Sequence, residues 1–395
     1  MIKEGAHTYI DGQGPVVPYT GKYAVKLEDP FAVIRDRWAA AGITDAYAYR
    51  PLRVEFELTD RCNDTCKSCG MGAKPVSEGV TLSDAQLDRL VAQFADVGLS
   101  SVAITGGEPF VSSRALYRFM EAARGTVDIG KLTTNGIWGT EKGTPHVFGR
   151  LAEAGFLDSR IFVPLLMVSI GEQTTPLDRI ARIIHHATTE FTDRELNVAV
   201  SSLADPADRK HRVYELLDVY EKTYGQFPHD RVHSTMRVYL ENERLADQAP
   251  INRPGETTVT RWMKACYDCF APTVGTYVLP CALMKVSGDL YSCAAFNVPE
   301  KLGFGNLFQE PFREILDRVN SSAYVRTVRA GHGLKGVGDV VPPSVTDRMT
   351  CGSFCGSCKL LINAFEAATG EQEPGGRLRT FIPLQGLSVR EGQSA

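Results

Sequence analysis

The fold and the chemistry of this chain are decided by one stretch, Leu58-Thr59-Asp60-Arg61-Cys62-Asn63-Asp64-Thr65-Cys66-Lys67-Ser68-Cys69. Its three cysteines have C-x3-C-x2-C spacing and follow an alternating apolar pattern typical of a β-strand, at Leu52, Val54, Phe56 and Leu58. Thiolates ligate iron–sulfur clusters, so three of them on one short loop can hold three irons of a [4Fe–4S] cube. The fourth iron then lacks a nearby protein ligand and stays open for chemistry. A zinc knuckle that lacks one ligand is the alternative interpretation of these cysteines.

Length and composition describe an ordinary globular protein. The chain has 395 residues, which suggests two domains and an extension, and 43% of its residues are hydrophobic and 23% charged. A net charge of −4 gives no basic footprint for nucleic acid or an anionic membrane surface. Residues 1–7 show no signal-peptide core, and no run of about 18 apolar residues predicts a transmembrane helix. Ten cysteines without a secretion signal indicate metal or redox chemistry in the cytoplasm.

Residues 1–50 are expected to form an N-terminal extension. Residues 29–41 predict one helix, with Phe31, Ile34 and Trp38 on one face. We expect this helix to pack against the domain that follows.

From about residue 51 to residue 250 the chain alternates strand and helix patterns, which is typical of a parallel sheet covered by helices. The expected strands are 52–58, 102–104, 131–133, 161–170, 196–201 and 234–240, and a helix follows each of the first five. The expected fold class is therefore α/β, and six repeats fall short of the eight in a complete TIM barrel. Charged residues alternate with apolar ones in the first strand, which predicts a half-covered edge strand.

A second motif, Gly106-Gly107-Glu108-Pro109, stands where the second expected strand ends, and sites on parallel α/β sheets lie at such ends. Glycines allow a backbone to approach a ligand closely, although the same sequence can be only a tight turn. Together with the cysteine spacing, it resembles the radical S-adenosylmethionine (radical SAM) family, whose core is a partial (β/α)6 TIM-like barrel. The resemblance implies a [4Fe–4S] cluster on Cys62, Cys66 and Cys69. It also implies that the GGEP motif binds the methionine end of SAM, with Glu108 accepting hydrogen bonds from the ammonium group.

Two further cofactor-binding candidates depend on the same resemblance. Asn135, at the end of the third expected strand, is a candidate to shape the cavity floor, although Asn-Gly is first of all a turn former. Ser169, at the end of the fourth, matches the place where the family often has a hydroxyl that contacts the ribose. The family usually carries an aromatic residue just before the third cluster cysteine, beside the adenine, and this chain has Ser68 there. The adenine contact must therefore come from another residue.

The C-terminal part, residues 251–395, holds the other seven of the ten cysteines: Cys266, Cys269, Cys281, Cys293, Cys351, Cys355 and Cys358. Gly288 predicts a hairpin turn that delivers Cys293 on its second strand. This order resembles the SPASM/twitch auxiliary-cluster domain of many radical SAM enzymes, although the last group has fewer cysteines than the full pattern. The resemblance implies one or two auxiliary [4Fe–4S] clusters. A structural zinc on the two C-x2-C pairs is the alternative, and it leaves three cysteines unexplained.

The sequence therefore predicts an extension (1–50), a radical SAM core (51–250) and an auxiliary-cluster domain with a tail (251–395). The resemblance implies that an electron from the reduced cluster cleaves SAM to methionine and a 5′-deoxyadenosyl radical, which removes a hydrogen atom from the substrate. The first hypothesis is modification of a ribosomally made peptide by crosslinking, epimerisation or oxidation. The second is oxidation or epimerisation of a carbinol centre in a small molecule such as an aminoglycoside. The third is an iron–sulfur electron-transfer or binding protein, which the GGEP loop disfavours.

The expected partners are a peptide or small-molecule substrate and an electron donor such as flavodoxin or ferredoxin. Cys266 is the best candidate for a thiol that no cluster uses, because it lies furthest in sequence from Gly288 and the last cysteines. Such a thiol can return a hydrogen atom to a substrate radical, which inverts a configuration without net oxidation. The alternatives for Cys266 are a second-cluster ligand or a buried small hydrophobe.

Overall fold

The structure is a computed structural model, which describes residues 30–42, 51–64, 66, 69, 71–170, 175–193, 195–202, 212–228, 232–235, 257–258, 281–291, 303–330, 334–351 and 354–370. The helix expected in the N-terminal extension is α1 (Pro30–Ala40). Its residue Ile34 is buried in a small cluster with Leu52, Ile161 and Phe162. The expected packing of this helix against the following domain is therefore confirmed.

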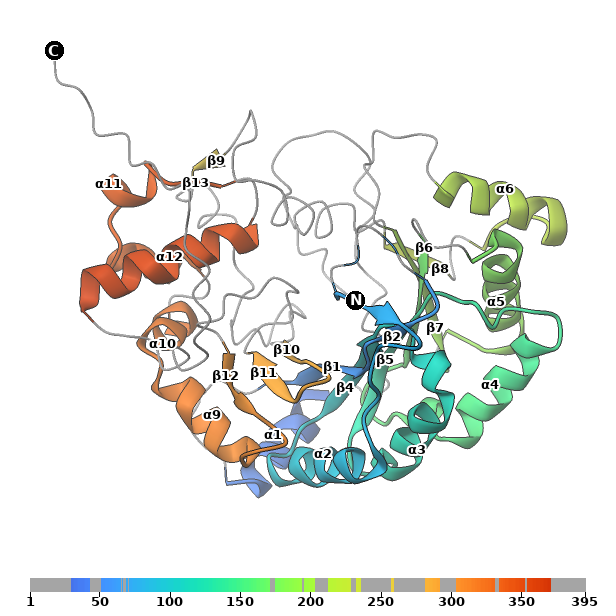
Figure 1. Ribbon diagram of the computed structural model, residues 1–395, viewed down its shortest axis with the longest axis horizontal. Coiled ribbons are helices and arrows are strands. Elements are labelled where there is room, and N and C mark those ends of the chain that lie inside the picture. Colours follow the sequence, from blue (N-terminus) through green and yellow to red (C-terminus); the bar gives the residue numbers. More distant parts are fainter. Residues whose placement is uncertain are drawn as a thin grey trace, which may run out of the picture.

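One sheet of nine strands organises the described part of the chain, in the order β12-β11-β10-β1-β4-β5-β6-β7-β8. Six consecutive strands of the sheet form its parallel barrel part: β1 (Arg53–Thr59), β4 (Ser101–Gly106), β5 (Asp128–Thr134), β6 (Leu165–Ile170), β7 (Asn197–Ser202) and β8 (Val232–Thr235). A helix follows each of the first five, and the sheet curves with these helices on its outer side (Figure 1). The predicted α/β fold with a partial (β/α)6 barrel is confirmed.

Five helices cover the outer face of the parallel strands: α2 (Asp84–Asp96), α3 (Ser113–Ala123), α4 (Gly143–Glu153), α5 (Leu177–Glu190) and α6 (Arg212–Tyr224). In α2, the Ser83 hydroxyl accepts a hydrogen bond from the Gln86 amide in a capping box, which satisfies amides that the first helical turn leaves open. Leu87, Leu90 and Phe94 of α2 are fully buried and join the apolar side chains of the strands in the main core. Burial of each such side chain contributes about 1.5–3 kcal/mol.

Strand β1 lies inside the sheet, between β10 and β4, so the predicted edge strand is wrong. All seven of its residues are buried. Its charged side chains belong to the inner side of the barrel, where the Glu55 carboxylate lies 2.9 Å from the Lys131 ammonium of β5. The charged residues of β1 therefore face a polar barrel interior. There an ion pair takes the place of the contact with solvent that the alternating pattern predicts.

The C-terminal part of the chain extends the barrel sheet. Strand β10 (Cys281–Met284) runs parallel to β1, and β11 (Asp289–Tyr291) and β12 (Gly303–Asn306) add antiparallel pairs. The predicted hairpin turn at Gly288 is confirmed, with φ at +92° between β10 and β11. Helix α9 (Phe312–Ser321) lies against α2, because the Gln93 amide oxygen accepts from the Phe312 amide at 2.6 Å. The division near residue 250 stays a prediction, and the sheet continues across it.

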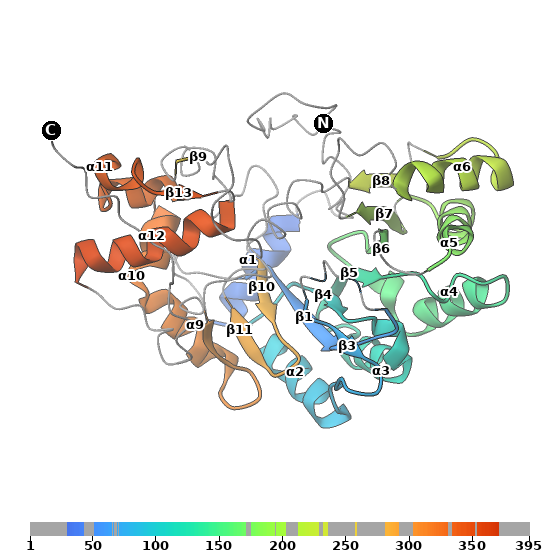
Figure 2. The ribbon, with the colours of Figure 1, turned by 45° about the horizontal axis from the view of Figure 1, so that its top comes forward.

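The remaining C-terminal elements lie beyond β12, on the side of the sheet away from α6 (Figure 2). They are β9 (Thr257–Thr258), α10 (Ala323–Ala330), α11 (Pro343–Thr346), β13 (Thr350–Cys351) and α12 (Phe354–Thr369). Tyr324 of α10 and Phe365 of α12 are buried with their ring centroids 5.5 Å apart. This aromatic pair joins the C-terminal helices to the main core.

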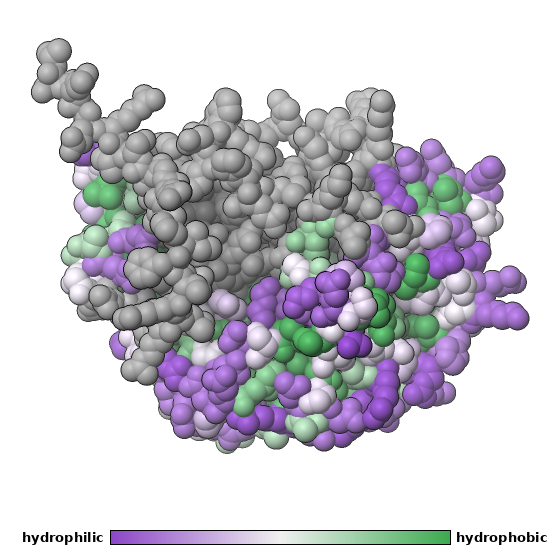
Figure 3. All heavy atoms as spheres, in the orientation of Figure 1, coloured by the Kyte–Doolittle hydropathy of each residue, from purple (hydrophilic) through white to green (hydrophobic). Residues whose placement is uncertain are grey.

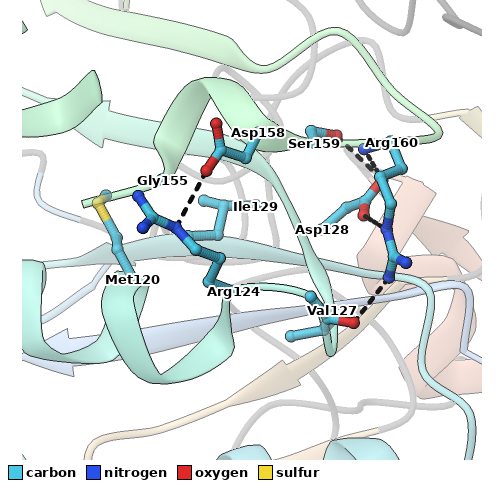
Figure 4. A pocket seen from close by; sticks show the side chains of 10 residues that line it. Met120, Arg124, Val127, Asp128, Ile129, Gly155, Asp158, Ser159 and Arg160 are labelled. Carbon is cyan, nitrogen blue, oxygen red and sulfur yellow. Dashed lines mark hydrogen bonds and ion pairs between the residues drawn. The ribbon is translucent and has the colours of Figure 1, made fainter. Parts of the chain in front are cut away.

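A small pocket lies at the amino-terminal end of β5, the end opposite to the predicted site (Figure 4). There the buried Asp128 carboxylate accepts hydrogen bonds from the Ser159 hydroxyl at 3.0 Å and from the Ile161 amide at 2.6 Å. Because this amide is bound to Asp128 and Pro164 has no amide hydrogen, β6 begins at Leu165 and not at residue 161 as predicted.

The described residues visible in Figure 3 include both hydrophilic and hydrophobic side chains. On the face shown in Figure 3, hydrophilic residues predominate along the lower and right-hand rim, and hydrophobic ones form smaller groups between them. No helix in the described ranges is long and apolar enough to cross a membrane.

Candidate functional site

Two short paired strands close the base of the loop that carries Cys62, Cys66 and Cys69, which we call the cysteine loop. Strands β2 (Arg61–Cys62) and β3 (Lys74–Pro75) pair in parallel, so the loop leaves the barrel edge and returns beside its own starting point. The Asp60 carboxylate lies 2.9 Å from the Lys74 ammonium, and Arg61 Nε donates to the Gly79 carbonyl at 2.8 Å. These contacts hold the loop at the carboxyl end of β1.

The three predicted cluster ligands, Cys62, Cys66 and Cys69, are half-buried on this one loop, and no disulfide joins them. The Cys69 amide donates to the Cys66 carbonyl at 3.1 Å, and the Asp64 amide donates to Cys62 Sγ at 3.4 Å. Burial raises the pKa of the Cys62 thiol to about 11, so a metal must displace its proton on binding. Three soft thiolate donors fit an iron–sulfur cluster. Within the described residues, no group of three His, Cys, Asp or Glu side chains is already arranged around a metal position.

The two glycines of the GGEP loop lie against the chain that leads to the cysteines. The Gly107 amide donates to the Thr59 carbonyl at 2.7 Å, and the Glu108 amide donates to the Arg61 carbonyl at 2.8 Å. A Cβ atom on Gly106 would lie 2.1 Å from the Thr59 oxygen, and one on Gly107 would lie 2.1 Å from the Arg61 oxygen. Glycine is therefore required here by the close approach of two backbones, whatever a ligand requires in addition.

The Glu108 side chain is fully buried beneath these loops. Its carboxylate accepts hydrogen bonds from the Asn135 amide at 2.6 Å, the Thr134 hydroxyl at 2.9 Å and the Phe110 amide at 3.1 Å. Burial raises the pKa of Glu108 to about 7, although these three donors oppose the shift. The predicted contact between Glu108 and an ammonium group stays a prediction, and in this structure protein donors surround the carboxylate.

Asn135 and Ser169 occupy the ends of the next two strands. Asn135 follows β5, where its Nδ2 donates to Asn63 Oδ1 at 3.0 Å, so its side chain contacts the cysteine loop. Ser169 lies near the end of β6 and is half-buried. Hydrogen bonds thus join the cysteine loop, the GGEP loop and Asn135, and Ser169 lies one strand further along the same edge.

The predicted auxiliary ligands fall in two places. Cys281 begins β10, directly beside β1, and Cys351 ends β13. Cys355 and Cys358 lie in the first turns of α12. The remaining predicted cysteines, Cys266, Cys269 and Cys293, lie outside the described residues.

Two residues near the site were missed by the sequence analysis. Asn63 lies within the cysteine stretch, and nothing in the sequence links it to Asn135, 72 residues later. Lys285 lies 2.8 Å from Glu57 of β1 across 228 residues, and no local pattern predicts that pair.

Comparison with known families agrees with this arrangement. The sequence model of the Radical SAM superfamily matches residues 56–194, which contain the cysteine loop, the GGEP loop, Asn135 and Ser169. This part of the chain belongs to the radical SAM superfamily.

Curated relatives show the same similarity over parts of the chain. A GTP 3′,8-cyclase of Staphylococcus carnosus is 32% identical over 174 residues, which are 40% of this chain and 48% of the cyclase. The putative peptide biosynthesis protein YydG of Bacillus subtilis is 25% identical over 232 residues, which are 56% of this chain and 70% of YydG. The chain thus spans about half the length of the first relative. Among solved structures, BtrN in complex with AdoMet and 2-DOIA is similar to this chain with a TM-score of 0.44 at 15% identity. The match covers 73% of this chain and 90% of BtrN.

Proposed function

We propose that this protein is an enzyme that cleaves S-adenosylmethionine reductively and removes a hydrogen atom from its substrate. The observation that carries the proposal is the backbone connection between the cysteine loop and the GGEP loop at the carboxyl edge of the barrel. When bound, the cluster and SAM supply a 5′-deoxyadenosyl radical. Cys62, Cys66 and Cys69 would hold three irons, and their loop would leave the fourth open to the amino acid end of SAM.

The chain's own residues position these groups and shield them from water. The GGEP loop would contact the methionine end of SAM, and Asn135 and Ser169 would shape the rest of the SAM site along the same edge. The charged inner face of the barrel, with the Glu55–Lys131 ion pair, suits a polar substrate. A site built in this way would favour the reaction by orientation and by excluding side reactions.

The test compares the native protein with a Cys62→Ala/Cys66→Ala/Cys69→Ala variant after anaerobic iron–sulfur reconstitution. With SAM and dithionite, the native protein should form 5′-deoxyadenosine and the variant should form none. Iron uptake by the native protein without any 5′-deoxyadenosine would favour the alternative, an iron–sulfur electron-transfer or binding protein.

For the substrate class, we propose a ribosomally synthesised peptide, which the enzyme would crosslink, epimerise or oxidise. The support is the similarity to YydG, which covers more of this chain than that to the GTP 3′,8-cyclase, together with the cysteine-rich C-terminal part. That part would hold one or two auxiliary [4Fe–4S] clusters on ligands drawn from Cys269, Cys281, Cys293, Cys351, Cys355 and Cys358. A small molecule such as an aminoglycoside is the second candidate substrate.

The two substrate classes are separated by a direct assay. The reconstituted enzyme is incubated with SAM and either a short peptide encoded beside its gene or a set of aminoglycosides, and products are analysed by mass spectrometry. Turnover of the peptide alone supports the proposal, and turnover of an aminoglycoside alone overturns it.

A further inference from the structure

Three loops at the carboxyl edge of the barrel form a closed ring of hydrogen bonds. The GGEP loop holds the stem of the cysteine loop through the Glu108 amide and the Arg61 carbonyl, at 2.8 Å. The Glu108 carboxylate then holds the turn after β5 through the Asn135 amide, at 2.6 Å. Asn135 Nδ2 completes the ring by donating to Asn63 Oδ1, at 3.0 Å, beside the first cysteine of the loop.

The surrounding fold fixes the orientation of the Asn135 side chain. Its Oδ1 accepts from the Ile137 amide at 3.1 Å, a local bond that asparagine makes readily in turns. Gly136 has φ at +76°, which lets the chain turn away immediately after Asn135. With the amide oxygen occupied and the backbone amide bound to Glu108, Nδ2 is left to reach the cysteine loop.

The Asn135–Asn63 bond differs from the rest of the ring in being made by two side chains near solvent. The other links use backbone groups or the buried Glu108 carboxylate, so removing them would disturb the core as well. Asn63 is exposed and Asn135 is half-buried. Substitution of these two residues therefore changes the link and leaves the packing beneath it intact.

We propose that Asn135 is a positioning residue for the cysteine loop, which it orients by donating a hydrogen bond to Asn63. The function of this link rests on the proposed function, since an oriented loop matters for a cluster and for SAM bound to it. The hydrogen bond itself joins two protein side chains and does not require a bound metal. Asn135 thus acts on the cysteines through Asn63, in addition to its proposed place in the SAM site.

The decisive variants are isosteric. In Asn135→Asp or Asn63→Asp, one amide still faces one carboxylate, so a donor and an acceptor remain once the surviving amide turns to suit its partner. In the Asn63→Asp/Asn135→Asp double variant, two carboxylates face each other and the bond is lost. The link therefore predicts strong non-additivity between two changes that are mild alone.

The readout is amide hydrogen exchange of the metal-free full-length chain. In the double variant and in Asn135→Ala, amides of the cysteine loop should exchange about fivefold faster or more, the size expected for one lost hydrogen bond. Each single Asp variant should stay within about twofold of the native rate. Amides of α2 serve as the control for global folding. A double variant that exchanges like the single Asp variants would overturn the proposal.

A second readout uses the reconstituted protein. If the loop is misoriented, the double variant should show a weaker change in the electron paramagnetic resonance spectrum of the reduced cluster on addition of SAM. The Asn63→Asp variant, which keeps Asn135, should respond as the native protein does. An unchanged response in the double variant, with faster loop exchange, would limit the link to the metal-free chain and overturn its role in positioning. Failure of the native protein to bind iron would instead refute the proposed function, and the exchange data would still decide the link.

Discussion

Lys285 Nζ lies 2.8 Å from Glu57 Oε1, although 228 residues separate the two along the chain. The other oxygen of the same carboxylate accepts from the Val286 amide at 3.0 Å. The Glu57 side chain is only 4% exposed and that of Lys285 is 25% exposed. Glu57 therefore holds the turn between β10 and β11 against the strand that leads into the cysteine loop.

Removing the lysine of this pair should destabilise the protein more than removing both charges. Lys285→Met leaves a buried carboxylate without its ion partner, which should lower the free energy of unfolding by about 2–3 kcal/mol. The Glu57→Gln/Lys285→Met double variant should lose less, since a neutral amide has a smaller desolvation cost. Urea unfolding measures both values. A double variant that loses as much as Lys285→Met, or more, would contradict the coupling.

The loss of folding stability at acidic pH should depend on Glu310. A hydrogen bond from Arg318 lowers the pKa of Glu310, and the Asn306 amide adds a second one at 3.1 Å. Because the folded pKa is lower than the unfolded value of about 4.3, this stabilisation is present above that value and is lost as the pH falls through the folded pKa.

Glu310→Gln should therefore lower the melting temperature at neutral pH and flatten its fall between about pH 5 and pH 3. Scanning calorimetry over this range measures the effect. Glu78→Gln, at an exposed position, is the control and should keep the native slope. If the melting temperature of Glu310→Gln falls with pH as steeply as that of the native protein, this would argue against the ion pair.

Two Gly→Ala substitutions should have opposite effects. In Gly107→Ala the new Cβ would lie 2.1 Å from the Arg61 carbonyl oxygen, so the two loops must separate, at a cost of about 3 kcal/mol. Gly149 lies in the exposed middle of α4, and a Cβ atom added there would meet nothing within 4 Å, so Gly149→Ala should stabilise by about 0.5–1 kcal/mol. Thermal unfolding measures both. Equal effects would mean that the close approach of the loops is absent in solution.

Iron content should divide between two parts of the chain. The anaerobically reconstituted protein should hold about eight irons or more, at four irons per cube. The variant with all three loop cysteines changed to Ala should hold about four irons fewer than the native protein, because the auxiliary ligands lie in the C-terminal part. Iron and acid-labile sulfide assays give these values. Zinc in place of iron, or four irons in the native protein, would contradict the auxiliary cluster.

Cys266 provides the test of a hydrogen-donating thiol. If it returns a hydrogen atom to the substrate radical, Cys266→Ala should keep its iron and lose at least about 100-fold in turnover, the scale of a lost catalytic group. The native enzyme working in deuterium oxide should then incorporate one solvent deuterium into its product. Loss of iron in the variant would identify Cys266 as a cluster ligand and favour oxidation or crosslinking.

The sequence by itself determined what depends on residues close together in the chain. The spacing of Cys62, Cys66 and Cys69 places three thiols on one loop, and the periods of strands and helices are local properties of the backbone. The α/β fold and the helices over the barrel were predictable for this reason. The GGEP motif could also be placed at the end of its strand, because sites on parallel sheets gather there.

Only the tertiary structure decided the contacts between distant residues. An alternating strand pattern shows which side chains share a face, and it cannot show which strands lie alongside, so the pattern of β1 predicts an edge strand although β10 lies beside it. The same holds for the partners of Glu57 and Asn63. The glycines of the GGEP loop are the clearest case: the sequence suggests space for a ligand, and the fold fills that space with the backbone of Thr59 and Arg61.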